Sequence, residues 1–158
     1  DKELQMMQLN IVALTHLCKL FARDMVKRGS GKILNIGSTG SFQPGPMMAV
    51  YCASKAYVLS FTEALANELE GTGVTATALC PGATQSGFQQ AAAMEKSKLM
   101  QGNFMDSGTV ARFGYEALMN NKMTVIPGFM NRALTFSVRF MPRKVVTKVA
   151  RSIMSPVK

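Results

Sequence analysis

Tyr51 and Lys55 stand four residues apart in the stretch YCASK, at the start of an apolar run with helical periodicity. Side chains at that spacing share one face of a helix. A tyrosine hydroxyl ionises near pH 10, and a neighbouring ammonium stabilises the phenolate and lowers that pKa. The pair could therefore give a proton to an alcohol oxygen or take one from it. A lysine follows some tyrosine at this spacing in roughly one chain in five of this composition, so the interpretation depends on the surrounding residues.

Two other segments are expected to reach the same place. Ser38 leaves a short buried strand predicted over 32–37, and the loop 81–86 (PGATQS) leaves a second strand predicted over 74–80. The carboxyl ends of neighbouring parallel strands meet at one rim of a sheet, where ligands bind. A serine hydroxyl at that rim can hold a carbonyl or alcohol oxygen while Tyr51 moves the proton. Such a set contains no electron carrier, so a redox reaction there needs a cofactor.

The elements that position these residues alternate between helices and strands. The pattern predicts helices over 2–28 and 49–70, strands over 32–37, 74–80 and 122–127, helices over 89–101 and 107–121, and basic amphipathic helices over 129–154 broken near Pro142. This order predicts an α/β fold with a parallel sheet, in a single domain over 1–158 that ends in a basic helical tail, 129–158. The helices over 2–28 and 49–70 are expected to cover the same face of the sheet. The first strand would present an apolar edge, which suggests that part of the domain is absent.

Composition excludes several classes of protein. The chain has 158 residues, of which 47% are hydrophobic and 17% charged, as in a globular protein and unlike a disordered one. No apolar run reaches the roughly 18 residues that span a bilayer. His16 is the only histidine, so a metal site made of several histidines is excluded, and no metal ligand is assigned. Three cysteines without metal-type spacing suggest reduced thiols and a cytoplasmic protein.

The net charge of +9 is concentrated in the last third of the chain. Residues 107–158 contain nine Lys or Arg and one Asp or Glu, whereas residues 1–106 are nearly balanced. The basic tail has three interpretations: a solvated face, a weak peripheral contact with a membrane surface, or a nucleic-acid site. Nucleic acid is the least favoured because the tail has no recognised binding motif and no aromatic stacking platform. The membrane contact is kept because Leu134, Phe136, Val138, Phe140 and Met141 lie among basic residues.

The spaced set of Ser38, then YCASK, then PGATQS resembles the catalytic half of the short-chain dehydrogenase/reductases. The resemblance implies a Rossmann-type doubly wound parallel sheet, of which about three strands are present here. It implies that Tyr51 is the acid/base, that Ser38 orients the substrate carbonyl, and that Lys55 lowers the Tyr51 pKa. Asn10, in QLNIVAL, would be the fourth catalytic residue and would hold a water linked to Lys55.

By the same resemblance, the cofactor is NADP or NAD, with NADP favoured, and the substrate is a small carbonyl compound or alcohol. The residues expected to contact the cofactor are Tyr51, Lys55, Pro81, Gly82, Thr84 and Ser86. Ser86 stands where the family usually has Thr. Family members commonly pair through the two long helices, so a homodimer or tetramer is expected.

The family's glycine-rich turn after the first strand, T-G-x-x-x-G-x-G, is not found in this sequence. That turn forms the pyrophosphate site at a helix N-terminus. The sequence is therefore expected to be a C-terminal catalytic portion that, alone, binds nicotinamide dinucleotide poorly and has little activity. The alternative is a catalytically silent scaffold or a peripheral membrane-interaction module.

Overall fold

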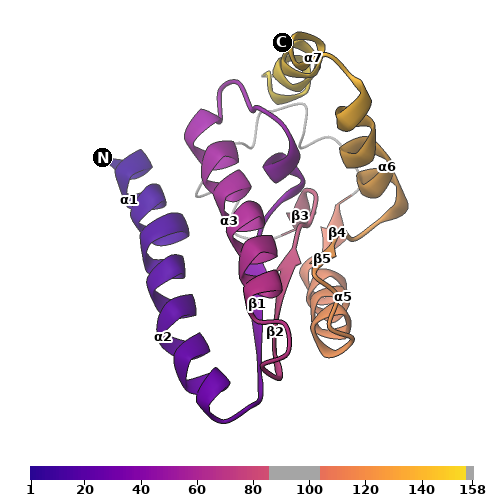
Figure 1. The fold of residues 1–158 in the computed structure, drawn as a ribbon. Coiled ribbons are helices and arrows are strands. Elements are labelled where there is room, and N and C mark those ends of the chain that lie inside the picture. The colour runs from indigo at the N-terminus through magenta and orange to yellow at the C-terminus, as the bar shows by residue number, and fades with distance from the viewer. Residues whose placement is uncertain (86–103, 156–158) are drawn as a thin grey trace.

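A computed structural model describes residues 1–85 and 104–155. Its main sheet has three parallel strands in the order β1 (Gly31–Ile36), β2 (Val74–Leu79) and β5 (Thr124–Val125). β1 and β2 pair over their full length, from Gly31↔Val74 to Ile36↔Leu79. The prediction of an α/β fold with a parallel sheet is confirmed (Figure 1).

The third strand is shorter than the predicted 122–127. β5 pairs with β2 only at Ala78↔Thr124 and Leu79↔Val125. Pro127 follows two residues later and has no backbone N–H to add to the ladder. The pairing therefore stops where the chain turns towards the tail.

One face of the sheet is covered by two long helical segments, as predicted. The first runs through α1 (Lys2–Met7), the π-helical η1 (Gln8–Ala13) and α2 (Leu14–Lys27); the second is α3 (Ala49–Glu68). Both contribute to one buried cluster with the two long strands: Cys18, Ala22, Ile33, Leu65, Leu69, Val74 and Ala76. Alternate strand residues point to this face because side chains of a strand alternate in direction.

The opposite face is covered by α5 (Ser107–Met119), close to the predicted helix 107–121 (Figure 1). The helix approaches closely at Gly114, where a Cβ would lie 2.6 Å from Leu79 Cδ2 and 3.5 Å from Leu34 Cδ2. A larger residue there would push the helix away from the sheet.

The loop after β2 contains a short ladder that periodicity did not predict. β3 (Thr84–Gln85) pairs in parallel with β4 (Met105–Asp106). Two-residue strands are too short to produce an alternating pattern. The predicted helix 89–101 and Ser86 lie outside the described residues.

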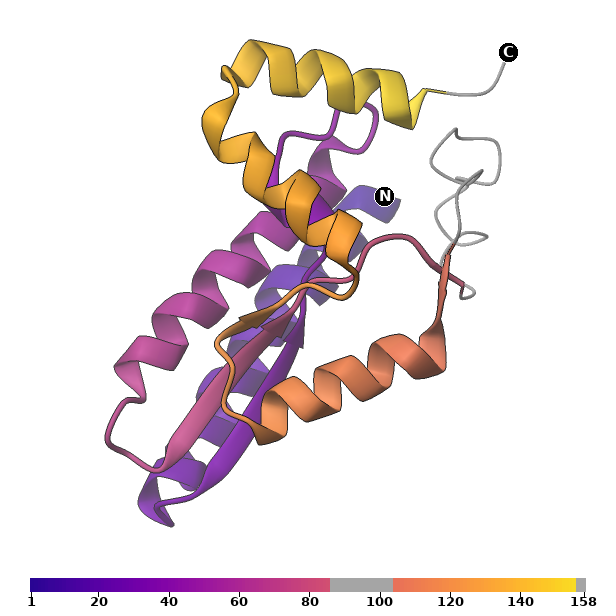
Figure 2. The same ribbon diagram turned by 90° about the vertical axis from the view of Figure 1, so that its right-hand side faces the viewer.

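The tail is helical and broken as predicted. It consists of α6 (Phe129–Ser137), the 3₁₀ turn η4 (Val138–Phe140) and α7 (Arg143–Met154), with Pro142 at the N-cap of α7. Figures 1 and 2 place α6 and α7 beyond the carboxyl ends of the strands. Over the described residues, we find no helix with the length and apolar content that a bilayer crossing requires.

β1 ends the main sheet on the side away from β5, and none of the described strands pairs with its outer edge. Ile36, the last residue of β1, is 45% exposed. The expectation of an uncovered apolar edge is therefore met within the residues that the structure describes.

Candidate active site

The candidate site lies at the carboxyl ends of β1 and β2. The residues that follow β1 are hydrogen-bonded to the end of β2 and to the loop after it. The N–H of Gly37 donates to the carbonyl of Leu79 at 2.7 Å, and the N–H of Thr39 donates to the carbonyl of Pro81 at 2.9 Å. A side chain at Gly37 would collide with the Cys80 sulfur, 2.7 Å from an added Cβ. The two loops predicted to meet at the sheet rim therefore do so.

Ser38 is held at the start of a 3₁₀ turn, η2 (Thr39–Phe42). Its Oγ accepts a hydrogen bond from the Gly40 N–H at 3.0 Å, and its own N–H donates to Ser41 Oγ at 3.1 Å. Ser41 Oγ in turn donates to the carbonyl of Lys55 at 2.8 Å. The turn that carries Ser38 is thereby fixed to α3.

The side chains of Ser38 and Tyr51 converge. They are hydrogen-bonded to each other, and this contact lowers the Tyr51 pKa. A Cβ built on Gly40 would lie 3.4 Å from Ser38 Oγ and 3.7 Å from Tyr51 Cε1, so the two side chains flank one point. The structure thus brings together the two hydroxyls that the sequence placed 13 residues apart.

The net direction of the Tyr51 pKa differs from the expectation. Burial is the largest influence and raises the pKa of the phenol above its ordinary value; the Ser38 hydrogen bond opposes this, and Cys52 and Cys80 add to the rise. At neutral pH the phenol is therefore protonated and can act as an acid.

The Lys55 ammonium is directed to the end of β1, and its expected lowering of the Tyr51 pKa stays a prediction. Nζ donates to the carbonyl of Ile36 at 2.9 Å and lies 5.9 Å from the centre of the Tyr51 ring. Burial is also the main cause that lowers the Lys55 pKa. Lys55 therefore places a cation over the phenol ring and ties α3 to the end of β1.

Asn10 lies in the π-helical segment and contacts the helix that carries Tyr51. Its Nδ2 donates to Ser54 Oγ at 3.0 Å, and Ser54 Oγ donates to the Tyr51 carbonyl at 2.8 Å. π-Helical segments are rare and often occur at functional sites. Asn10 thus belongs to the same cluster; its expected link to Lys55 through a water stays a prediction.

The loop after β2 is held by the tail. A Cβ on Gly82 would lie 2.7–3.0 Å from the Asn131 side-chain amide, whose Nδ2 donates to the Pro127 carbonyl at 2.8 Å. Thr84 Oγ1 donates to the Gly82 carbonyl at 3.0 Å. Pro81, Gly82 and Thr84 therefore lie at the predicted rim, with α6 packed against them.

Sequence reasoning missed Ser41 and Asn131 as supports of the site. Ser41 had a detectable signal, since Ser38 and Ser41 have the spacing of a capping box, which the structure contains. Asn131 had none, because a single sequence does not show which loop a tail residue will contact.

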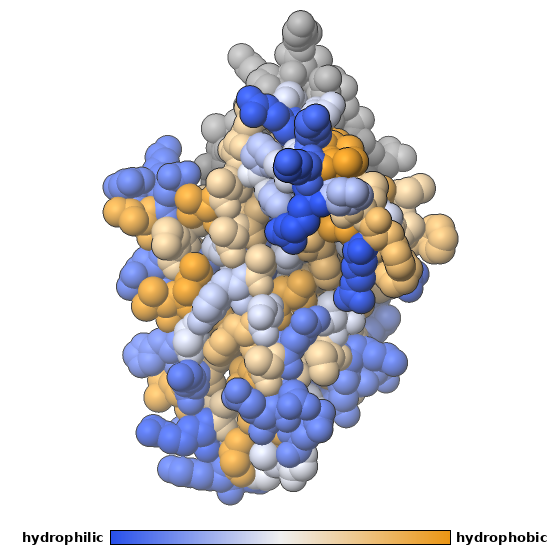
Figure 3. Space-filling model, turned by 45° about the horizontal axis from the view of Figure 1, so that its top comes forward, coloured by the Kyte–Doolittle hydropathy of each residue, from blue (hydrophilic) through white to orange (hydrophobic). Residues whose placement is uncertain are grey.

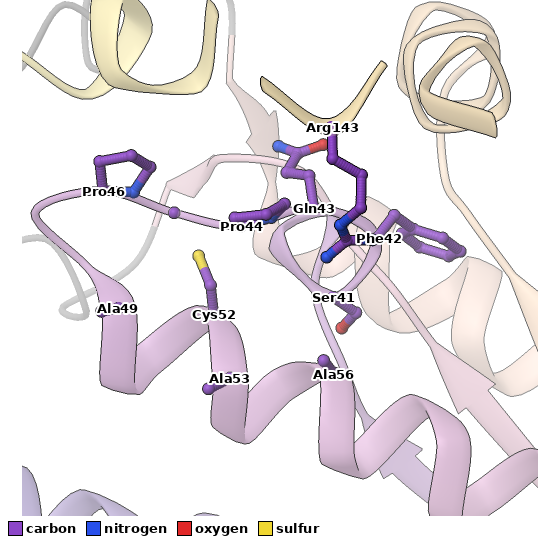
Figure 4. A pocket seen from close by; sticks show the side chains of 11 residues that line it. Ser41, Phe42, Gln43, Pro44, Pro46, Ala49, Cys52, Ala53, Ala56 and Arg143 are labelled. Carbon is purple, nitrogen blue, oxygen red and sulfur yellow. The ribbon is translucent and has the colours of Figure 1, made fainter. Parts of the chain in front are cut away.

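A cavity of about 610 Å³ lies near this cluster, between loop 41–46, α3 and the start of α7 (Figure 4). Cys52, Ala53 and Ala56 form its floor, and the side chains of Gln43 and Arg143 lie at its far wall. Neither Ser38 nor Tyr51 lines it. The cavity is therefore distinct from the place where the two hydroxyls meet.

The fold agrees with comparisons to known proteins. Residues 2–97 match the family model for the short chain dehydrogenases. The match covers more than half of the chain, so the chain belongs to the short-chain dehydrogenase family.

Individual relatives are similar over parts of their length. A 3-oxoacyl-acyl-carrier-protein reductase, FabG, from Haemophilus influenzae is 40% identical over 48% of this chain and 31% of its own. An uncharacterized oxidoreductase of Staphylococcus epidermidis is 30% identical over 77% of this chain and 54% of its own. A solved short-chain dehydrogenase from Sphingobium yanoikuyae, in complex with NADPH, has a TM-score of 0.74 and 28% identity over 85% of this chain and 52% of its own. The chain thus spans between 31% and 54% of the length of these three relatives.

Proposed function

We propose that this chain is the catalytic part of an NAD(P)-dependent oxidoreductase that interconverts a carbonyl compound and a secondary alcohol. The observation that carries the proposal is the convergence of the Ser38 and Tyr51 hydroxyls at the end of β1, with the Lys55 ammonium beside them. One hydroxyl to hold an oxygen and a second to protonate it are what carbonyl reduction needs from a protein.

In the reductive direction, the Ser38 hydroxyl donates a hydrogen bond to the substrate oxygen and fixes its position. Tyr51, protonated at neutral pH, then delivers its proton to that oxygen as the alcohol forms. In the oxidative direction, the same phenol oxygen takes the proton back. The nicotinamide, when bound, supplies or accepts the hydride.

The residues at the rim suit the nicotinamide end of a dinucleotide. Lys55 and Tyr51 offer ribose contacts, and the loop with Pro81, Gly82 and Thr84 borders the same rim; Ser86 would follow it. Gly82 leaves room for the Asn131 side chain, which holds this loop against α6. The NADPH complex of the Sphingobium yanoikuyae relative supports NADP over NAD.

The remaining parts of the dinucleotide need a glycine-rich turn that this sequence does not contain. We therefore propose that the chain alone has little activity, and that turnover is measured best on the product of the complete gene. Reduced cysteines and the family favour a cytoplasmic enzyme.

The test is to incubate the complete gene product with NADPH or NADH and a panel of ketones. Formation of the secondary alcohol in step with cofactor oxidation is expected. Ser38→Ala removes a hydrogen-bond donor to the reacting oxygen and should reduce kcat by about 10²-fold. Absence of alcohol product with every carbonyl compound and both cofactors would rule the proposal out.

A further inference from the structure

The tail exposes many large apolar side chains. Its exposed large apolar side chains are Phe129, Met130, Leu134, Phe136, Phe140, Val145, Val149 and Ile153. Phe129 and Phe140 are 78% and 75% exposed, and Phe140 stacks edge-on with Phe136 at 5.2 Å. We call this surface of α6, η4 and α7 the tail face. Exposed apolar side chains that gather on one surface are typical of an interaction site.

The tail face is also strongly basic. Residues 129–155 contain six Lys or Arg and no Asp or Glu. Within residues 1–85 and 104–155, the ion pairs join Arg23 and Lys27 to Asp24 in α2, and none involves the tail. The charges of the tail are therefore available to an anionic partner.

The two kinds of residue occupy separate stripes on α7. Val146 and Ala150 are each 4% exposed and pack against the body of the protein. Val145, Val149 and Ile153, spaced four residues apart, form an exposed apolar stripe next to this buried side. The exposed residues Lys144, Lys148 and Arg151 lie on the side of α7 opposite Val146 and Ala150. Figure 3 shows hydrophilic and hydrophobic residues side by side on the upper part of the molecule.

We propose that the tail face docks on the surface of an anionic lipid membrane, with the aromatic and aliphatic side chains in the headgroup region and the basic residues against lipid phosphates. A helix with an apolar stripe flanked by Lys and Arg lies in the plane of a membrane interface without crossing it. Neutral lipid would satisfy only the apolar stripe, whereas anionic lipid also satisfies the charges.

Other occupants fit the tail face less well. A second copy meeting it face to face would bring six basic residues against six basic residues. Nucleic acid would pair with the charges but would leave Leu134, Val149 and Ile153 in water. A segment that extends the sheet beside β1 would not cover the tail face. It would lie on the side of the sheet away from β5, whereas the tail follows β5 in the chain.

The test uses the 158-residue chain and its lack of tryptophan. Phe136→Trp places a single fluorophore on the tail face, and Phe113→Trp, on α5, is the matched reporter away from it. With vesicles of phosphatidylcholine and phosphatidylglycerol at low salt, the emission of Phe136→Trp should shift to the blue and that of Phe113→Trp should not. The protein should sediment with these vesicles and remain in the supernatant with pure phosphatidylcholine.

Charge reversal separates lipid binding from general stickiness. Each basic residue near an anionic surface contributes about fivefold to partitioning. Lys144→Glu with Lys148→Glu should therefore weaken vesicle binding by more than about tenfold, whereas Lys2→Glu with Lys19→Glu, on the first helical segment, should not. Circular dichroism checks that all variants fold.

Three results would overturn the proposal. They are no sedimentation with anionic vesicles at low salt, equal binding to neutral and anionic vesicles, and a blue shift of Phe136→Trp that follows protein concentration without vesicles. The last would assign the tail face to self-association.

Discussion

Two buried thiols, those of Cys52 and Cys80, lie near the turn that follows β1. Burial raises the Cys80 pKa from its ordinary value of 9.0 to about 11, and the Cys18, Cys52 and Tyr51 pKa values are raised for the same main reason. Cys80 follows β2 directly, is fully buried and lies against Gly37. The folded state therefore keeps these groups neutral in a pH range where the unfolded chain would ionise.

This predicts that stability falls at high pH. A group whose pKa is higher in the folded state stabilises that state fully below the unfolded value, and the contribution is lost as pH rises through the folded value. For Cys80 the window runs from 9 to about 11, and the loss is at most about 3 kcal/mol. Urea unfolding across this window should give a shallower pH dependence for Cys80→Ala than for the parent chain. Equal slopes would show that Cys80 is not a source of the effect.

Part of the candidate site could be predicted from the types and spacing of its residues. Ser38 and Tyr51 could be predicted because their chemistry is unusual in combination and their strand and helix were recognisable. The direction of the Tyr51 pKa could not be predicted, since the burial of this side chain depends on contacts between distant segments. The contact of the Lys55 ammonium could not be predicted either, because it depends on the position of the Ile36 carbonyl in the folded protein.

At the scale of elements, the two turns at the amino ends of β1 and β2 are packed against each other. Gly29 and Gly73 have positive φ angles of 69° and 79°, and a Cβ on Gly73 would lie 2.0 Å from the Gly29 carbonyl oxygen. Gly71 has a similar φ of 77°, but a Cβ there would have no neighbour within 4 Å. Glycine is therefore required at Gly73 both by its positive φ and by the close approach of the Gly29 backbone.

The two glycines make a matched pair of variants. Gly71→Ala should reduce the free energy of unfolding by about 1–2 kcal/mol, the cost of a left-handed alanine. Gly73→Ala carries that cost and must also displace the Gly29 backbone, so it should lose about 1–3 kcal/mol more. Thermal or urea unfolding measures both. Equal losses would mean that the two turns do not contact each other as described.

The long elements were predictable and the short ones were not. Helices over 2–28 and 49–70 have strong periodicity, and β1 and β2 are apolar runs bounded by Gly and Pro, so their bounds agree with the structure within two residues. The β3–β4 ladder and the 3₁₀ turn after Ser38 depend on contacts between distant segments. The π-helical segment around Asn10 could not be predicted either, because its apolar residues fit the spacing of an ordinary helix.

At the scale of the molecule, apolar side chains remain exposed along the first helical segment. Leu9, Leu17 and Phe21 are 70%, 51% and 54% exposed. We propose that this surface pairs two copies of the protein, as expected from the resemblance to the family, because a pair would bury these side chains and leave the basic tail outside the contact.

Light scattering tests the proposed homodimer directly. Light scattering of the complete gene product at micromolar concentration should give the mass of a dimer or tetramer, and Leu17→Glu should shift the mass towards a monomer by placing a charge in the contact. Phe113→Glu, on α5, is the control and should leave the mass unchanged. A monomer at every concentration would contradict the pairing.

The measurement that tests the central claim most directly compares Tyr51→Phe with Tyr115→Phe in the complete gene product. Tyr115 is 62% exposed on α5, away from the site, and loses the same single oxygen. If the Tyr51 hydroxyl supplies the proton in carbonyl reduction, Tyr51→Phe should lower kcat by about 10²–10⁴-fold with an unchanged unfolding midpoint, and Tyr115→Phe should have no effect. Full turnover by a folded Tyr51→Phe protein would contradict the assignment of the acid.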